Sequence, residues 1–221
     1  MIKPMKTTET ALKVNEIFYS LQGESLSSGL PTLFVRLTGC PLRCQYCDTA
    51  YAFHEGKSMT LNEILSTVQS YQPRYITVTG GEPLAQKACH VLLTELCDAG
   101  YEVSLETSGA LDVAQVDPRV IKVVDFKTPG SGESEKNRYQ NIAHLDRKDQ
   151  VKFVLCDERD YAWAKQMIDE YKLASVCEIL FSPSYQELEA SRLADWILTD
   201  RLPVRMQIQL HKVLWGDVPG K

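Results

Sequence analysis

The sequence predicts an α/β fold, an incomplete and open (β/α) barrel with mainly parallel strands. Apolar, β-branched runs alternate with amphipathic helical patterns along most of the chain, which is typical of strands joined by helical crossovers and therefore of a parallel sheet. The chain has 221 residues, whereas a closed eightfold barrel typically needs about 250. We therefore expect a barrel that does not close.

The first strand is expected at Leu30–Thr38, where a period of two places Leu33, Val35 and Leu37 on one face and Arg36 on the other. A helix then begins after Thr60, which is expected to cap it. Further strands are expected at Arg74–Thr79, Glu102–Glu106, Ile121–Lys127, Val151–Leu155, Glu178–Phe181 and Val204–Leu210, and further helices at Gln86–Ala99, Glu158–Lys172 and Gln186–Thr199. Residues 128–138 are rich in glycine, serine and charge, which favours a loop.

A single domain is expected over residues 1–221, with residues 1–13 as a flexible N-terminal arm. The first residues are polar and lack an apolar signal segment, and no run approaches ~18 apolar residues. We therefore expect a cytoplasmic protein without a membrane span. The net charge of −5 and the lack of a Lys/Arg-rich run argue against a direct nucleic-acid partner.

Polar clusters follow the predicted strands, beginning with a cysteine-rich stretch after Thr38 and continuing with T-G-G-E-P, E-T-S-G, D-F-K, S-P-S and Q-L-H-K. In barrel-type α/β proteins the active site lies at the carboxyl ends of the strands. The sequence therefore predicts a site at this rim.

Cys40, Cys44 and Cys47 have the spacing C-x3-C-x2-C on one short loop. Three thiolates so placed suit a four-iron cluster or a zinc ion, although structural zinc normally has four ligands in two separated pairs. Spacing alone leaves both sites open, and also three unrelated thiols. The remaining cysteines are expected to be small apolar side chains, namely Cys89, Cys97, Cys156 and Cys177.

The segment C-P-L-R-C-Q-Y-C-D-T (residues 40–49) resembles the CxxxCxxC signature of the radical S-adenosylmethionine (SAM) superfamily, and T-G-G-E-P (residues 79–83) is similar to its GGE motif. The resemblance implies a reduced barrel of the radical SAM type. It also implies a 4Fe-4S cluster held by the three cysteines, with SAM on the open iron.

A closer resemblance, to the 7-carboxy-7-deazaguanine synthases, runs from E-I-F-Y-S-L-Q-G-E (residues 16–24) through the cysteines and L-E-T-S-G to Q-L-H-K. It implies a lyase that converts 6-carboxytetrahydropterin to 7-carboxy-7-deazaguanine with loss of ammonia, in queuosine biosynthesis. It further implies a homodimer and a reductant protein such as flavodoxin.

By position, the resemblance also assigns residues to three ligands. The SAM-binding residues are Tyr46, Cys47, Asp48, Gly81, Glu106 and Lys127. The residues that bind the pterin substrate are Leu21, Gln22, Gly23, Arg36, Thr79 and His211, and the magnesium ligand is Thr49. Several of them have a plainer alternative. Arg36 or Glu106 could form a structural ion pair, Thr49 could cap a helix, and Lys127 could lie on the surface. Asp125 and Phe126 stand where the family has serine and proline.

Two other functions fit parts of the pattern. An enzyme that activates a glycyl-radical partner shares CxxxCxxC and GGE, but is expected to lack L-Q-G-E and the D-T pair after the cysteines. A zinc-stabilised binding module without activity would need only the cysteines.

Overall fold

The computed structural model describes residues 10–216, 218 and 220, and its described strands form one nine-stranded sheet in the order β3-β1-β2-β4-β5-β6-β7-β8-β9. The strands are β1 (Ala11–Leu21), β2 (Pro31–Leu37), β3 (Lys57–Thr60), β4 (Tyr75–Gly80), β5 (Glu102–Thr107), β6 (Ile121–Asp125), β7 (Gln150–Leu155), β8 (Glu178–Pro183) and β9 (Arg205–Met206). The α-helices are α1 (Leu61–Tyr71), α2 (Cys89–Asp98), α3 (Glu158–Glu170), α4 (Ala190–Asp200) and α5 (Leu210–Trp215).

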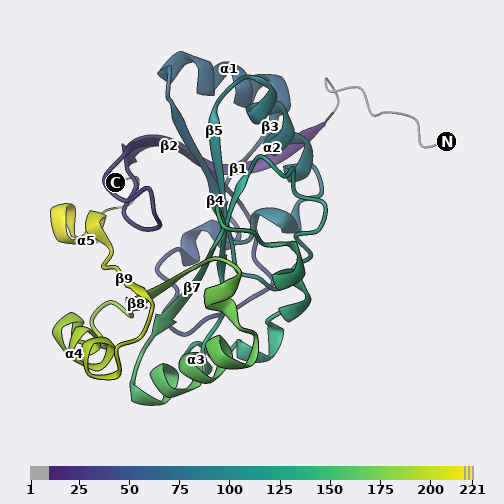
Figure 1. The fold of residues 1–221 in the computed structure, drawn as a ribbon. Helices are drawn as coiled ribbons and strands as arrows, with labels where there is room; N and C mark the ends of the chain where they lie inside the picture. The colour runs from purple at the N-terminus through teal and green to yellow at the C-terminus, as the bar shows by residue number, and fades with distance from the viewer. Residues whose placement is uncertain (1–9, 217, 219, 221) are drawn as a thin grey trace.

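Strands β2 and β4 to β9 run parallel, and β1 is antiparallel to both β2 and β3. Strands β3 and β9 are the two edges, so the sheet does not close. Figure 1 shows the curved sheet with α1, α2 and α3 around its outside and α5 on the other side. The predicted open barrel with mainly parallel strands is confirmed.

The chain enters the sheet earlier than predicted. Strand β1 begins at Ala11, and Leu12 and Val14 are buried while Lys13 pairs with Ser58 of β3. A flexible arm that extends to residue 13 is therefore wrong for residues 11–13, and residues 1–9 lie outside the described part. The polar residues that alternate with these buried ones concealed a strand whose hydrophobic face is only every second residue.

Local signals placed most other elements well. Leu33, Val35 and Leu37 of β2 are fully buried, as the alternation predicted. Helix α1 has the expected capping box between Thr60 and Glu63, which satisfies backbone groups that have no partner inside the helix.

Several boundaries moved, and helix α4, for example, begins at Ala190 rather than at residue 186. Helix α2 begins at Cys89 rather than at residue 86, because the preceding residues form a short 3-10 helix, Pro83–Ala85, and a turn. The predicted strand Val204–Leu210 is wrong beyond Met206: only Arg205–Met206 pairs with β8, and Leu210 begins α5. The backbone N–H of Gln207 still donates to Phe181 of β8, while its side chain bonds to Ser182 and to the backbone N–H of Ser25.

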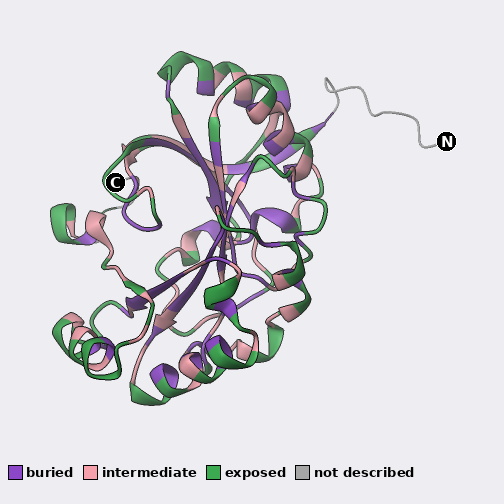
Figure 2. Cartoon of the chain, viewed as in Figure 1, coloured by how far each residue is buried: buried purple, intermediate pink, exposed green. Residues whose placement is uncertain are grey.

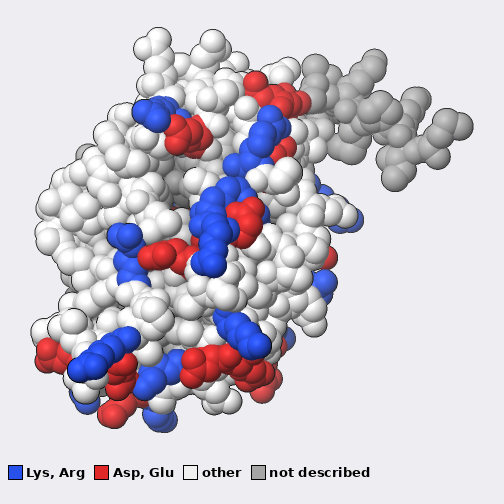
Figure 3. All heavy atoms as spheres, in the orientation of Figure 1, with Lys and Arg blue, Asp and Glu red and all other residues white. Residues whose placement is uncertain are grey.

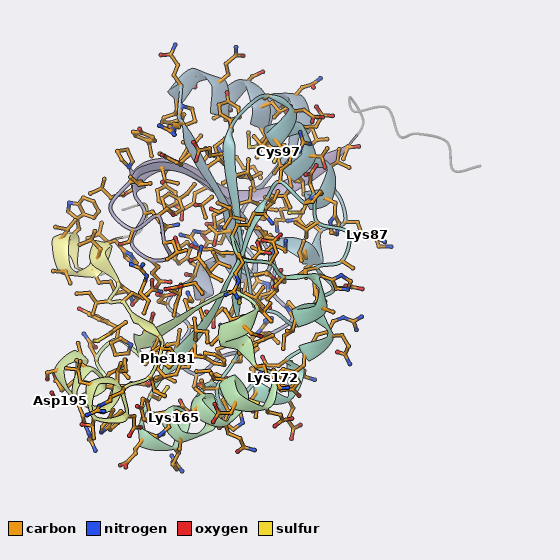
Figure 4. The ribbon with its side chains drawn as sticks, in the orientation of Figure 1. Lys87, Cys97, Lys165, Lys172, Phe181 and Asp195 are labelled. Atoms are coloured by element: carbon orange, nitrogen blue, oxygen red, sulfur yellow. The ribbon has the colours of Figure 1, made fainter. Side chains whose placement is uncertain are left out.

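The sheet packs against its helices through two apolar clusters. One, beneath α1 and α2, is mainly aliphatic, and the other, beneath α3 and α4, contains a group of aromatic rings. Phe181 of β8 is fully buried there and meets the rings of Phe153 and Tyr161 edge-on (Figure 4). Figure 2 shows buried strands inside the molecule and helices whose outer faces are exposed.

Among the isolated cysteines, Cys89 and Cys177 are buried as predicted, whereas Cys97 and Cys156 are only half-buried. In the described residues, no helix is long and apolar enough to cross a membrane. On the face shown in Figure 3, lysine and arginine side chains lie among aspartate and glutamate side chains, so this face presents no broad field of one sign.

Candidate functional site

The carboxyl ends of the strands surround a cavity of about 390 Å³. Every residue that the sequence assigned to the cluster, SAM, substrate or magnesium lines it, although these residues are spread from position 21 to position 211. Parallel strands place their carboxyl ends at one rim, which explains why such distant residues meet.

The cysteine loop, residues 39–49, is shaped by contacts within it and by bonds to distant segments, such as that from the Gln45 N–H to the Ser131 carbonyl at 3.0 Å. The backbone N–H of Leu42 donates to Cys40 Sγ at 3.4 Å, and that of Cys47 to the carbonyl of Cys44 at 3.2 Å. Gly39 has φ +98°, a conformation that glycine adopts without steric cost. The loop thereby presents all three cysteines to the cavity.

The donor set fits a cluster better than a single ion. In residues 10–216 no three His, Cys, Asp or Glu side chains converge as ligands of one metal ion, so a zinc site has no ligand set there. A four-iron cluster takes each thiolate on a different iron, so its ligands need not converge on one point. Burial raises the pKa of Cys44 to about 11, with Lys127 acting against it, so iron binding must displace the thiol protons.

The T-G-G-E-P turn packs directly on this loop. A Cβ atom on Gly81 would lie 2.4 Å from the Gly39 carbonyl oxygen and 2.8 Å from Cys40 Cβ, so only glycine fits. Glu82, by contrast, is fully buried, and its carboxylate accepts hydrogen bonds from Thr107 and Ser108 of the E-T-S-G segment. The two motifs therefore form one unit, which the sequence patterns did not reveal.

A second polar group lies on the inner face of β4 and β5. Gln22 Nε2 donates to Glu106 Oε1, and Thr79 Oγ1 to Glu106 Oε2, both at 3.2 Å. Burial raises the pKa of Glu106, while Lys152 and Arg36 act in the opposite direction. Glu106 is thus held by hydrogen bonds from neutral donors rather than by the direct ion pair that was its plainer alternative.

Five charged residues that the sequence analysis did not assign also line the cavity, namely Glu24, Asp125, Lys152, Glu187 and Lys212, and the first three of them form one group. Lys152 Nζ contacts Glu24 Oε2 and lies 3.3 Å from Asp125 Oδ2, while Lys127 Nζ lies 3.1 Å from the same Asp125 oxygen. Although burial alone would lower the pKa of Lys127, the Asp125 carboxylate raises it. Its side chain is 12% exposed, so Lys127 is a largely enclosed cation and not a surface lysine.

Two features of the sequence could have identified these residues as members of the site. Lys152 is a lysine inside an otherwise apolar strand, and Glu24 is the last residue of the L-Q-G-E motif. Neither spacing shows that the two are partners, because 128 positions separate them.

Arg36 forms the ion pair that was its plainer alternative: its Nε lies 2.7 Å from Glu16 Oε1, across the β1–β2 pair. Arg36 nevertheless lines the cavity, and its guanidinium lies over the rings of Phe18 and Tyr51. In the described residues its two terminal nitrogens form no hydrogen bond, so the pair with Glu16 orients the group without using all of its donors.

The C-terminal segment, residues 207–216, covers part of the cavity. The backbone N–H of Leu210 donates to the carbonyl of Gly23 at 3.0 Å, and the His211 ring lies so close that a Cβ on Gly23 would be 2.0 Å from Nδ1. Lys212 Nζ lies 3.2 Å from Asp48 Oδ2. The last part of the cysteine loop is thus bound to the C-terminal segment.

Burial would raise the pKa of Asp48, but Lys212 and hydrogen bonds from Gln209 and Thr49 lower it to about 2. Thr49 Oγ1 donates to Asp48 Oδ1 at 2.9 Å and forms no cap bond to the short 3-10 helix that follows, Ala50–Phe53. The capping alternative for Thr49 is therefore not what the structure has.

Residues 34–124 match the radical SAM superfamily. The 7-carboxy-7-deazaguanine synthase of Chlorobaculum tepidum is 46% identical over 213 residues, which are 95% of this chain and 97% of that protein. The enzyme of the same name from Koribacter versatilis is 39% identical over 219 residues, 92% of this chain and 97% of that protein. The crystal structure of QueE from Escherichia coli has the same fold, with a TM-score of 0.76 at 22% identity over 93% of this chain and 96% of that one.

Proposed function

The chain belongs to the 7-carboxy-7-deazaguanine synthases, radical SAM lyases of queuosine biosynthesis, and we propose that its cavity converts 6-carboxytetrahydropterin to 7-carboxy-7-deazaguanine with loss of ammonia. The observation that carries this proposal is the shared cavity: the three cysteines, L-Q-G-E and the D-T pair all line one space. That combination distinguishes the lyase from an activating enzyme, which requires only the cysteines and the GGE turn.

Cys40, Cys44 and Cys47 would hold the 4Fe-4S cluster. When bound, the cluster and SAM supply the 5′-deoxyadenosyl radical that removes a hydrogen atom from C6 of the substrate. The N–H of Leu42 donates to Cys40 Sγ, and such a bond stabilises the thiolate that iron requires. The close contact of Gly81 with Gly39 and Cys40 holds this backbone against the cysteine loop.

The SAM molecule would lie along Tyr46, Cys47, Asp48, Gly81 and Lys127. Lys127 lies 5.9 Å from the centre of the Tyr46 ring, so a cation and an aromatic face border the same part of the cavity. We place Glu106 with the substrate rather than with SAM, because its two hydrogen bonds come from Gln22 and Thr79, which belong to the substrate group.

The pterin would bind between Leu21–Gly23, Thr79 and His211, with Arg36 at its carboxylate. The guanidinium is oriented through Nε by Glu16, which leaves its terminal nitrogens for a planar carboxylate. Positioning of this kind contributes to catalysis because the reacting atoms are held in one geometry before the radical forms.

Magnesium would be bound by the hydroxyl of Thr49, with substrate oxygens and water as further ligands. The hydroxyl now donates to Asp48, so its lone pairs point away from that bond and are available to a cation. Asp48, held as a carboxylate by Lys212, would add negative charge close to the ion.

We also propose a cytoplasmic location, a flavodoxin-like reductant and a homodimer. Clustered thiols suit a reducing compartment. Arg43 is exposed beside Cys44 in the cysteine loop and would attract an acidic electron donor. Val213 and Leu214 of α5 are exposed by 66% and 49%, and such apolar side chains favour association.

Anaerobic turnover tests the function. The reconstituted protein, SAM, a reductant and 6-carboxytetrahydropterin should yield 7-carboxy-7-deazaguanine and ammonia, detected by mass spectrometry. Formation of 5′-deoxyadenosine without the deazaguanine would contradict the substrate assignment, and a colourless protein with zinc and no iron would contradict the reaction class.

A further inference from the structure

Lys152 connects two carboxylates that face different parts of the cavity. It lies on β7 and is only 8% exposed. Its ammonium contacts Glu24, in the loop after β1, and lies 3.3 Å from Asp125 Oδ2, at the end of β6. A buried lysine between two carboxylates remains charged, and the pKa of Lys152 is raised accordingly, although burial acts against it.

Glu24 belongs to the substrate side. Its backbone N–H donates to Gln22 Oε1 at 3.2 Å, and the amide of Gln22 in turn donates to Glu106. Glu24 therefore continues the chain of polar groups that we assign to the pterin. A carboxylate at this place would accept N–H groups of the pterin ring.

Asp125 belongs to the opposite side, next to Lys127 and the aromatic ring of Tyr46. Its Oδ2 is shared by Lys127 and Lys152, but its buried Oδ1 has no hydrogen-bond partner among the described residues, and neither has the buried Tyr46 hydroxyl. A buried carboxylate oxygen without a donor is costly. Because Asp125 lines the cavity, a donor on a bound ligand can satisfy it.

A second buried lysine shows that this arrangement is not merely how the fold accommodates charge. Lys122 lies at the start of β6, and its Nζ is 2.9 Å from Asp149 Oδ2. Both oxygens of Asp149 have partners, since Oδ1 accepts from the backbone N–H of Lys122 and Oδ2 from that of Asp146. This pair does not line the cavity and is complete without a ligand, unlike Asp125.

We propose that Lys152 is a positioning residue for both ligands: it fixes Glu24 toward the pterin and Asp125 toward SAM. This rests on the proposed function, which supplies the identity of the two ligands. With its Oδ2 held by Lys152, Asp125 presents Oδ1 to a hydroxyl or ammonium donor of SAM. The same ammonium holds Glu24 in place, so one side chain sets the affinity of two sites.

The test measures the dissociation constants of SAM and 6-carboxytetrahydropterin separately, by anaerobic calorimetry on the reconstituted protein. Glu24→Gln should weaken the pterin about tenfold with little change for SAM, and Asp125→Asn should do the reverse, as expected for one charged hydrogen bond. Lys152→Met should weaken both ligands by at least the same factor. Lys122→Met is the matched control, which should lower Tm and leave both constants unchanged.

The outcomes separate this role from a structural one. The proposal is overturned if Lys152→Met alters neither constant or only one, or if Lys122→Met alters both. Should Lys152→Met fail to fold, Lys152→Arg keeps the charge but moves it, and must weaken both ligands for the proposal to stand. Wild-type protein that binds no pterin would overturn the proposed function itself, whereas wild-type binding with an unaffected Lys152 variant overturns only the role of Lys152.

Discussion

The cysteine loop and the C-terminal segment meet at the cavity through Asp48 and Lys212, yet they are held in different ways. The loop combines bonds between near neighbours, such as that from Cys47 to Cys44, with bonds to distant residues, among them Glu82, Ser131 and Glu133. The C-terminal segment is held by distant residues: Leu210 bonds to Gly23, and Gln209 Nε2 donates to Asp48 Oδ2.

This difference has a consequence for function. A loop held both by its own contacts and by several distant residues can present its thiols before any ligand arrives, whereas a segment held by a few distant contacts can be released when one of them is lost. We therefore expect changes in the loop to abolish the chemistry, and changes in the segment to alter substrate binding.

The largest effect is expected in the loop. Cys44→Ala removes one of three cluster ligands and should abolish both iron loading and product formation. Iron content and the electron paramagnetic resonance signal of the reduced protein measure this. Cys97→Ala is the control, because Cys97 lies on the outer helix α2 (Figure 4), and it should retain full iron content. Comparable iron in both variants would contradict the assignment.

The C-terminal segment should respond most strongly to Gly23→Ala. The added Cβ would lie 2.0 Å from His211 Nδ1, so the ring and the segment must move. We expect KM for the pterin to rise by about tenfold or more, in line with losing a few binding contacts, while iron content stays at the wild-type level. An unchanged KM would show that His211 does not contribute to the site.

Lys212→Met tests the contact between the two regions directly. It removes the cationic partner of Asp48, and we expect about a threefold to tenfold weaker pterin binding, because the pair is only partly buried. Lys165→Met is the control, since Lys165 pairs with Asp200 on the outer helices. Equal effects of the two substitutions would mean that the Asp48 contact has no special role.

Thr49→Val tests whether the Thr49 hydroxyl in the cysteine loop binds magnesium. The substitution keeps the side-chain shape but removes the hydroxyl, so added magnesium should stimulate wild-type turnover and leave the variant unaffected, with a residual rate about tenfold lower. Turnover is measured against magnesium concentration in chelator-treated protein. Equal stimulation of both proteins would place the ion elsewhere.

The smallest effect concerns pH. The pKa of Asp48 in the folded protein is about 2, below its ordinary value of 3.8, so its contribution is fully present above about pH 4 and is lost only as the pH falls toward 2. The ratio of pterin dissociation constants between Lys212→Met and wild type should therefore stay constant from about pH 5 to 8. A ratio that falls with acidification in this range would contradict the low pKa.

Sequence patterns were reliable where the cause is local. The period of two in β2, the capping box at Thr60 and the cysteine spacing depend on neighbours within a few residues, so they can be recognised in the chain itself. The same reasoning missed β1, whose polar outer residues hide its buried face, and it extended the last strand to Leu210, although the pairing with β8 ends at Met206 and Leu210 begins α5.

The sequence by itself determined the reaction class, because the cysteines, the GGE turn and L-Q-G-E resemble the motifs of one family, and it determined that polar residues gather at the strand ends. Only the tertiary structure decided which of these groups are partners. Glu82 joins Thr107 and Ser108, and Lys152 joins Glu24 across 128 positions. The physical reason is that a buried charge needs a counter-charge close to it in space, and the curvature of the sheet, not the order of the chain, brings the two together.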